Sequence, residues 1–295
     1  MVTILYFIRY LVSIKTLSYF PAQCAGNSPP VMSAVLDALR ANGVKTVENS
    51  WDTDAAIIWS VLWNGRMRAN QPVYEHYRRL NRPVIIIEVG ALHRGRTWKV
   101  SVNHVTSQGY YGHTQDLDPD RPAKLGVKLS KPNIHRPDIM IAVQHSRSLQ
   151  VQDLPSQESW ILDRIRDLQA VSDRPVVIRP HPRSRLNLPH LPAGARIEIP
   201  HPVPNTYDGF DMDYSYHAVV NYNSGPGTQA AISGCRPVVH ESSLAAPVSV
   251  AINDIEKPYE IDRSQWLIEI CHTEYTVEEL RIGLWLKRIA SHLVL

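Results

Sequence analysis

The sequence has few cysteines and no internal repeats. Its three cysteines, Cys24, Cys235 and Cys271, are far apart and odd in number, which argues against a disulfide framework and against a zinc site. No low-complexity tract is present either, so a disordered chain or a repeat array is not indicated. The scarcity of cysteine suits a reducing compartment, and we expect a cytoplasmic protein.

Long apolar runs are also missing. The most apolar segment lies at the start of the chain, but Arg9 and Lys15 interrupt it before a membrane span of about 20 residues can form. Because no clear small-residue cleavage site follows, we interpret residues 4–8 as a first core strand rather than part of a targeting segment. We therefore expect no stable membrane insertion.

Neither sign of charge dominates the chain. The net charge of +3 is too small to indicate a nucleic-acid-binding protein by itself. Two local basic clusters are nevertheless present, HRGRTWK at residues 93–99 and RPHPRSR at residues 179–185. Each cluster is either a solvated loop or part of an anion-facing cleft.

The composition and the apolar pattern indicate an α/β protein. The 295 residues suit two domains of about 150 residues each, and 44% of them are hydrophobic. Alternating strand-like and helix-like stretches predict a doubly wound parallel sheet in each half. The predicted strands are residues 55–61, 84–89, 138–143 and 175–178, and the predicted helices are residues 31–41, 73–80, 156–171, 263–271 and 277–293.

Residues 109–137 break this alternation. They are rich in glycine, proline and aspartate and show no sustained period, as expected for a domain boundary or a long functional loop. We predict domains at residues 1–130 and 131–275, with a C-terminal helix at 276–295 that is a candidate for crossing back to the first domain.

The stretch VVNYNSGPGTQAAISGCRPVVHES, residues 219–242, predicts a strand, a tight turn, a helix of small residues and a second strand. Such a unit places its two strands in parallel. Amide groups at a helix start bind phosphate or carboxylate, so the turn is a candidate anion site. Ordinary turn chemistry also accounts for these glycines, since neither P-loop nor dinucleotide-binding spacing is present.

Together with VVIRPHPRSR about forty residues earlier, this stretch resembles the donor half of GT-B glycosyltransferases, nearest to the capsule polysaccharide Kdo-transferase-like group. The chain also resembles phage glycosyltransferases that add sugars to modified DNA bases. The resemblance implies two Rossmann-like domains whose parallel sheets face a central cleft. It covers about residues 138–242, and an Asp-Gly pair common in the group is replaced here by Val89-Gly90.

The resemblance implies a donor site at the carboxyl ends of the second-half strands. His181 would act as a catalytic group and, with two arginines, offset charge on the departing nucleotide diphosphate, so that no metal or other cofactor is required. Taken alone, His181 is better explained as a loop residue hydrogen-bonded to the backbone, and it is its pairing with the Ser-Gly turn that favours a catalytic role. Glu241 either binds the ribose or caps a turn. The implied donor-binding residues are Arg179, Arg183, Asn223, Ser224, Gly225, Gly227, Thr228 and Glu241.

The acceptor side needs a base that removes a proton from a hydroxyl. Glu88 follows a predicted strand and is the candidate, either as that base or as a structural carboxylate paired with an arginine. Asp116, Asp118 and Asp120 are alternatives in a loop-like segment. The candidate acceptor-binding residues are His93, Arg94, Arg96, Trp98, Lys99 and Tyr110, with Tyr111 nearby.

The leading hypothesis is a metal-independent, inverting hexosyltransferase that uses a nucleotide sugar, with a UDP-sugar as the expected donor. A hydroxymethylated pyrimidine in DNA would be the acceptor, flipped into the active site. A capsular or lipid-linked saccharide is the alternative acceptor. A non-catalytic nucleotide- or nucleic-acid-binding protein and a nucleotide-sugar epimerase of the same fold are further alternatives.

Overall fold

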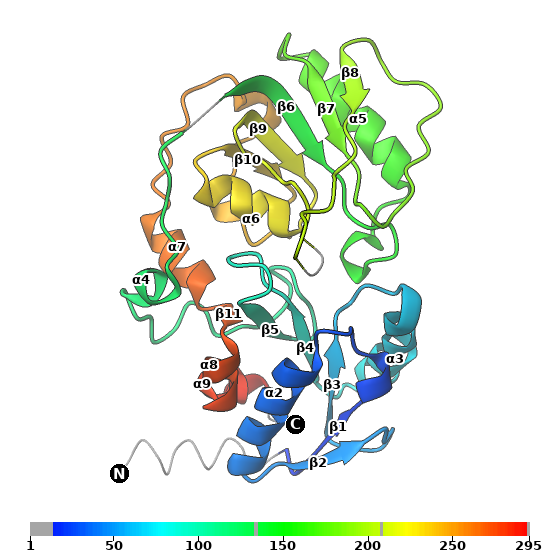
Figure 1. Ribbon diagram of the computed structural model, residues 1–295, viewed down its shortest axis with the longest axis vertical. Coiled ribbons are helices and arrows are strands. Elements are labelled where there is room, and N and C mark those ends of the chain that lie inside the picture. The colour runs from blue at the N-terminus through cyan, green and yellow to red at the C-terminus, as the bar shows by residue number, and fades with distance from the viewer. Residues whose placement is uncertain (1–13, 133–134, 207–208, 294–295) are drawn as a thin grey trace. The chain divides into compact units, whose positions relative to one another are not determined.

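A computed structural model describes residues 14–132, 135–206 and 209–293 of the chain (Figure 1). It divides into two compact units, unit 1 with Met1–Asp118 and Glu269–Leu295, and unit 2 with Pro119–Ile268. The boundaries between these units follow residues 118 and 268, whereas the domain boundaries predicted from the sequence follow residues 130 and 275. The strand predicted at residues 4–8 lies outside the described residues.

Unit 1 contains a six-stranded sheet with the order β11-β5-β4-β3-β1-β2. The first four strands of the chain pair in parallel, whereas β5 and β11 are antiparallel additions at one edge. The sequence pattern missed β1, β2 and β5. The strands are β1 (Thr16–Tyr19), β2 (Lys45–Glu48), β3 (Ala55–Trp59), β4 (Val84–Val89), β5 (Trp98–Val102) and β11 (Glu274–Tyr275).

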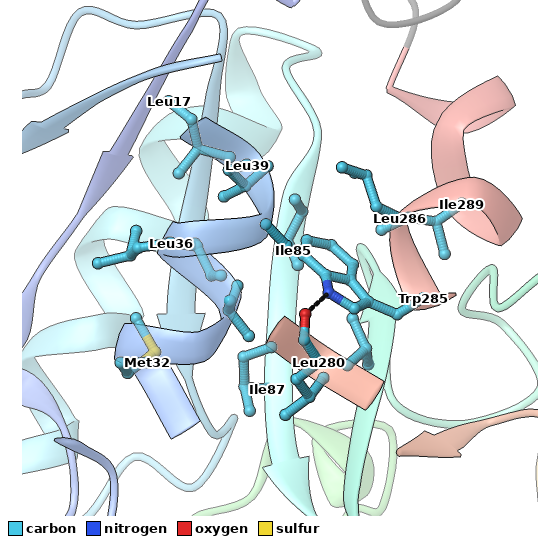
Figure 2. Close-up of a cluster of buried hydrophobic side chains, with 14 of the residues drawn as sticks. Leu17, Met32, Leu36, Leu39, Ile85, Ile87, Leu280, Trp285, Leu286 and Ile289 are labelled. Carbon is cyan, nitrogen blue, oxygen red and sulfur yellow. Dashed lines mark hydrogen bonds between the residues drawn. The ribbon is translucent and has the colours of Figure 1, made fainter. Parts of the chain in front are cut away.

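Helices cover the unit 1 sheet, and the last segment of the chain belongs to this unit. The apolar side of α2 packs with β3, β4, α8 and α9 around buried Trp285, whose indole N–H donates to the Leu280 carbonyl oxygen at 2.9 Å (Figure 2). The helices are α2 (Pro29–Ala41), α3 (Asn70–Arg79), α8 (Val277–Arg281) and α9 (Leu284–Ile289), with 3₁₀ helices η1 (Pro21–Gln23), η2 (Gly65–Ala69) and η6 (Ala290–His292).

The prediction of a single helix at residues 277–293 is wrong. It is broken at Gly283, which has φ 78° between α8 and α9. This left-handed conformation is one that glycine adopts without the steric cost of a side chain. The break lets Leu280 and Trp285 both face the core.

Unit 2 contains a five-stranded sheet with the order β10-β9-β6-β7-β8, in which every neighbouring pair is parallel. The predicted parallel pairing of the strands around the Asn-Ser-Gly turn is thereby confirmed. The strands are β6 (Arg136–Ala142), β7 (Val176–Arg179), β8 (Ala195–Ile197), β9 (Tyr216–Asn221) and β10 (Arg236–Val239).

Both faces of this sheet are covered. Ile161, Ile165 and Leu168 of α5 pack on one face, and α6 packs on the other through Ala230. The helices are α4 (Arg121–Leu125), α5 (Gln157–Gln169), α6 (Gly225–Ile232) and α7 (Ser264–Cys271), and the 3₁₀ helices are η3 (Leu149–Val151), η4 (Ala246–Val248) and η5 (Ile252–Asp254).

The predicted fold class is confirmed as two α/β units with mainly parallel sheets. Each sheet has a point where the strand order reverses, between β1 and β3 in unit 1 and between β6 and β9 in unit 2. Ligands of open α/β sheets bind outside the carboxyl ends of the strands at such points. Among the described residues, no helix combines the length and apolar character needed to cross a membrane.

Candidate functional site

The carboxyl ends of the strands in unit 2 bring the two sequence motifs together. Arg179 ends β7 and Asn221 ends β9, and both pair in register with Ala142 at the end of β6. Registered neighbours point to the same face, and adjacent strands are about 4.8 Å apart, so Arg179 and Asn221 lie about 10 Å from each other on one face. Only the small Ala142 side chain stands between them.

The turn after β9 is held by Asn221. Its Nδ2 donates to the Ala142 carbonyl oxygen (2.8 Å) and to Ser224 Oγ (3.0 Å), and its Oδ1 accepts the Ser224 N–H (2.8 Å). Ser224 is the N-cap of α6, yet its side chain makes no capping bond to the described helix. A helix start without a side-chain cap is suited to bind phosphate or carboxylate.

Asn223 cross-links the same turn to two other strand ends. Its backbone N–H and its Oδ1 exchange hydrogen bonds with the Gln144 side chain at 2.8 and 2.9 Å. Its Nδ2 donates to the Gln150 carbonyl oxygen (3.0 Å) and Ser242 Oγ (2.9 Å). Asn223, assigned to the donor by resemblance, thus positions the loops after β6, β9 and β10.

Two histidines follow β6 and β7. The rings of His145 and His181 lie edge to face, with centroids 5.1 Å apart. His145 Nδ1 accepts the Arg147 N–H and His181 Nδ1 accepts the Arg183 N–H, each at 3.1 Å. In the neutral form, both rings therefore carry their proton on Nε2.

His145 is the more buried of the two. Its Nε2 is buried and has no hydrogen-bond partner of good geometry in the described part of the chain. Burial lowers the pKa of His145, the Arg147 charge lowers it further, and the Arg183 backbone acts in the opposite direction. This shift favours the neutral ring, whose Nε2–H is a donor that an incoming acceptor atom would satisfy.

Arg179 is engaged within unit 2. Its Nη2 donates to both the carbonyl oxygen and Oδ1 of Asp211 at 2.8 Å, and its Nη1 lies 4.0 Å from Glu198 Oε2. The residue is only 7% exposed, and its Nε lacks a partner among the described residues. The guanidinium therefore fastens the segment around Asp211 to the end of β7.

The remaining donor candidates differ in their surroundings. A Cβ at Gly227 would lie 2.7 Å from Val239 Cγ1, so this glycine lets α6 pack closely on β10. Thr228 is buried within α6, Gly225 begins the helix and is half-buried, and Glu241 is exposed. Arg183 is exposed in the loop that follows β7.

In unit 1, Glu88 lies at the end of β4 beside the end of β3. Its Oε2 accepts from Ser60 Oγ at 2.7 Å, and its Oε1 accepts from the Val89 N–H at 3.0 Å. The side chains of Arg94 and Arg96 are exposed, whereas the Glu88 carboxylate is bound by Ser60 and by backbone N–H groups. Glu88 is half-buried, so the carboxylate is held in place while part of it remains accessible.

Lys99 lies between two carboxylates on the same sheet. It pairs in register with Glu88 on β4 and with Glu274 on β11. Burial lowers the pKa of the Lys99 ammonium, and the charges of Glu274 and Glu88 oppose this shift. Burial also raises the pKa of nearby Tyr111, and the Ser101 hydroxyl opposes this shift.

Glu274 fastens the basic loop at residues 90–97. Its carboxylate accepts from the backbone N–H groups of Ala91 (2.6 Å) and Leu92 (3.0 Å) and from Thr97 Oγ1 (2.7 Å). A Cβ at Gly90 would come within 2.3 Å of this carboxylate. The same Cβ would lie 2.4 Å from the Thr97 backbone carbonyl oxygen, so the close approach of this carbonyl and of Glu274 requires the glycine after β4.

The predicted acceptor-binding residues do not share one surface. Trp98 and Lys99 are 7% and 9% exposed and belong to the sheet, and Tyr110 stacks on His292 with ring centroids 3.3 Å apart. His93 is half-buried, and the Arg94 and Arg96 side chains are exposed.

The alternative acidic residues lie in the segment that leaves unit 1. Asp116 is exposed, with its Oδ2 3.9 Å from Lys287 Nζ. Asp118 donates its N–H to His272 Nε2 at 3.1 Å, and Asp120 is the N-cap of α4. None of these three contacts places a carboxylate at the end of a described parallel strand.

Several residues of these sites were missed from the sequence, among them His145, Gln144 and Glu274. His145 and Gln144 follow β6 directly, so their position at a strand end was the signal that could have found them. Glu274 had no such signal, because its contacts span more than 170 residues of sequence. Among the described residues, no group of three or more His, Cys, Asp or Glu side chains could hold a metal ion.

The chain is similar in structure to known glycosyltransferases. It matches two KpsC structures from Thermosulfurimonas dismutans, the β-Kdo 2,4 transferase (10% identity, TM-score 0.48, 95% of this chain and 98% of that one) and the β-Kdo 2,7 transferase (12%, 0.49, 92% and 99%). It also matches the glycosyltransferase SnogD from Streptomyces nogalater (10%, 0.29, 96% and 99%). No family model and no curated protein sequence matches the chain.

Proposed function

We propose that the protein is a glycosyltransferase that moves a sugar from a nucleotide-sugar donor to a hydroxyl group of a saccharide. The observation that supports this most is His145. Its buried Nε2–H has no hydrogen-bond partner of good geometry among the described residues, and it lies beside His181 at the carboxyl edge of the unit 2 sheet. An N–H donor in that environment is suited to a phosphate oxygen.

In this proposal, unit 2 binds the donor phosphate. The Nε2–H groups of His145 and His181 and the amide groups at the start of α6 would donate to phosphate oxygens, and Arg147 and Arg183 would add positive charge. As the bond from the anomeric carbon to the phosphate oxygen breaks, these donors stabilise the negative charge that develops on the leaving group. Such a site needs no metal, and a UDP-sugar remains our expected donor.

Unit 1 would hold the acceptor. Glu88 would accept the proton of the attacking hydroxyl while Ser60 and the Val89 N–H fix the orientation of its carboxylate. Direct attack on the anomeric carbon from the side opposite the leaving group inverts that centre. We therefore propose an inverting transferase.

A saccharide acceptor is favoured over DNA by the burial of the aromatic and basic residues. Trp98 and Lys99 are inside the sheet, and Tyr110 is stacked on His292, which leaves Arg94 and Arg96 as the exposed cations of this group. Duplex DNA is bound through several phosphate contacts, with base contacts added for specificity. The hydroxymethylated pyrimidine acceptor remains the alternative.

A substrate panel tests the proposal. The protein is incubated with nucleoside diphosphate sugars and nucleoside monophosphate sugars, each with simple glycosides, with hydroxymethylated DNA or with plain DNA, and products are identified by mass. Transfer to a glycoside with little dependence on salt supports the proposal. Transfer to DNA would establish the alternative acceptor. The absence of both donor hydrolysis and transfer would overturn the enzymatic proposal. The same assay is run on the His181→Gln variant. His190 is an exposed histidine on the loop after β7, so His190→Gln is the matched control.

A further inference from the structure

Two loops meet at the carboxyl edge of the unit 1 sheet, where its strand order reverses. One connects β1 to α2 and contains η1, and the other connects β3 to α3 and contains η2. Asn70 joins them, because its Nδ2 donates to the Gln23 carbonyl oxygen (3.2 Å) and to the Trp59 carbonyl oxygen (2.6 Å). Strand ends at such a reversal are where open α/β sheets bind ligands.

These loops contain buried polar atoms that the described residues leave without a hydrogen-bond partner. They are Gln23 Oε1, Asn27 Oδ1 and Asn70 Oδ1, together with the indole Nε1 of Trp63. Asn70 is fully buried and Trp63 is 5% exposed. Unpartnered buried polar side-chain atoms are uncommon in folded proteins. Four of them on these two loops and the first residue of α3 therefore call for an explanation.

The orientation of the Asn70 amide is determined by its contacts. Both hydrogen bonds of Nδ2 go to carbonyl oxygens, which accept only, so the nitrogen must face them and Oδ1 must face away. The Asn70 amide oxygen therefore requires a donor, and the Trp63 indole requires an acceptor, whereas the Gln23 and Asn27 amides can be satisfied through either end. A sugar hydroxyl group supplies both a donor and an acceptor, whereas a DNA phosphate supplies acceptors alone and leaves the Asn70 amide oxygen unsatisfied.

The loop between β3 and α3 also carries the residues that orient Glu88. Ser60 Oγ donates to Glu88 Oε2 at 2.7 Å, and the Leu62 N–H donates to Ser60 Oγ at 3.1 Å. One loop thus connects the carboxylate that would accept a proton with the unpartnered Trp63 and Asn70. A hydroxylated ring near Glu88 would have its other hydroxyl groups within reach of this loop.

We infer that Gln23, Asn27 and Asn70, with the Trp63 indole, form a subsite for the hydroxyl groups of a neutral saccharide acceptor. This inference rests on the proposed function and deepens it by restricting the saccharide acceptor to a neutral one and naming the residues that would hold it. The amide oxygens accept from sugar hydroxyl groups and so orient the ring whose free hydroxyl attacks. Ionic groups of the acceptor are not recognised here.

Two conservative variants test the subsite. Gln23→Met retains the length of the side chain and removes its acceptor oxygen, and Asn27→Ala removes a half-buried amide. Each is expected to raise the KM for the glycoside acceptor about tenfold, the effect of one lost hydrogen bond of about 1.4 kcal/mol, with a smaller change in kcat. Asn64→Ala, an amide on the β3–α3 loop outside this set, is the matched control and should leave KM unchanged.

A binding titration separates this inference from the proposed function. Methyl hexosides are titrated into the wild-type full chain and both variants without donor, with a DNA oligonucleotide as the ionic comparison. Saturable hexoside binding that weakens in both variants supports the subsite, even if no donor is turned over. Unchanged hexoside binding and KM in folded variants, or no hexoside binding by the wild type, would overturn it. Urea unfolding of each variant establishes that it is folded.

Discussion

His145 and His181 lie edge to face at the ends of neighbouring strands, with their ring centroids 5.1 Å apart. Each ring accepts a backbone N–H on Nδ1, and so each presents Nε2–H in its neutral form. Two preoriented donors at the carboxyl edge of a parallel sheet suit an anionic leaving group. The basic RPHPRSR motif contributes one of these histidines and the segment after β6 contributes the other.

Loss of either histidine should reduce donor turnover. We expect His145→Gln and His181→Gln to lower kcat/KM for the nucleotide sugar by about 10²-fold, as is typical when one donor to developing charge is removed. His190→Gln should have no effect. Steady-state kinetics on the donor measures this, and wild-type values in both variants would remove the histidines from the site.

Arg179 should matter for stability. Replacing Arg179 by Ala leaves Asp211 without its partner and removes a largely buried group, so we expect a loss of about 2–3 kcal/mol, reduced by the exposure of Asp211. Asp211→Asn should cost less, and the double variant should be less destabilised than the sum of the two. Urea unfolding midpoints provide the measurement. A stable Arg179→Ala protein with impaired donor kinetics would instead assign Arg179 to the leaving group.

Gly227 should be intolerant of a side chain because of β10. Gly227→Ala brings a methyl group to 2.7 Å from Val239 Cγ1, and we expect a destabilisation of about 1–3 kcal/mol. Val239→Ala in the same chain should recover much of it by removing the clash. Failure of the second substitution to restore stability, measured by urea unfolding, would show that the glycine serves another purpose.

Lys99 should affect the pH dependence of transfer. The ammonium faces Glu88 and Glu274 across neighbouring strands. A carboxylate that loses a nearby cation is protonated more easily, so Lys99→Met should move the acid limb of the kcat/KM profile to higher pH. Lys99→Arg retains the charge and should move it less. An unshifted acid limb in Lys99→Met would separate this residue from the proposed base.

His217 should weaken the fold in mild acid. Burial, followed by the charges of Arg236 and Arg174, lowers the pKa of His217 below the ordinary 6.5. The unfolded chain therefore binds a proton more readily, and the free energy of unfolding should fall as the pH drops below about 6.5 toward the lower folded pKa. His217→Gln should flatten this dependence. Urea unfolding at pH 5.5 to 7.5 checks it, and an identical slope in both proteins would contradict it.

The sequence by itself determined the α/β class, several strand and helix positions and the strand-turn-helix-strand unit at residues 219–242. These features depend on local periodicity and turn residues, which one sequence displays directly. Position after an apolar run also marked Glu88 and His181 as strand-end residues.

Only the tertiary structure decided which side chains meet. The register of β7, β6 and β9 places Arg179 and Asn221 on either side of Ala142. His145, which contacts the His181 ring, follows a different strand from His181. Burial of Lys99 and the contact of Glu274 with the loop at residues 90–97 depend on antiparallel strands added at the edge of the unit 1 sheet. Long-range pairing leaves no periodic signal in the chain, because its energy comes from contacts formed only after the strands have been arranged.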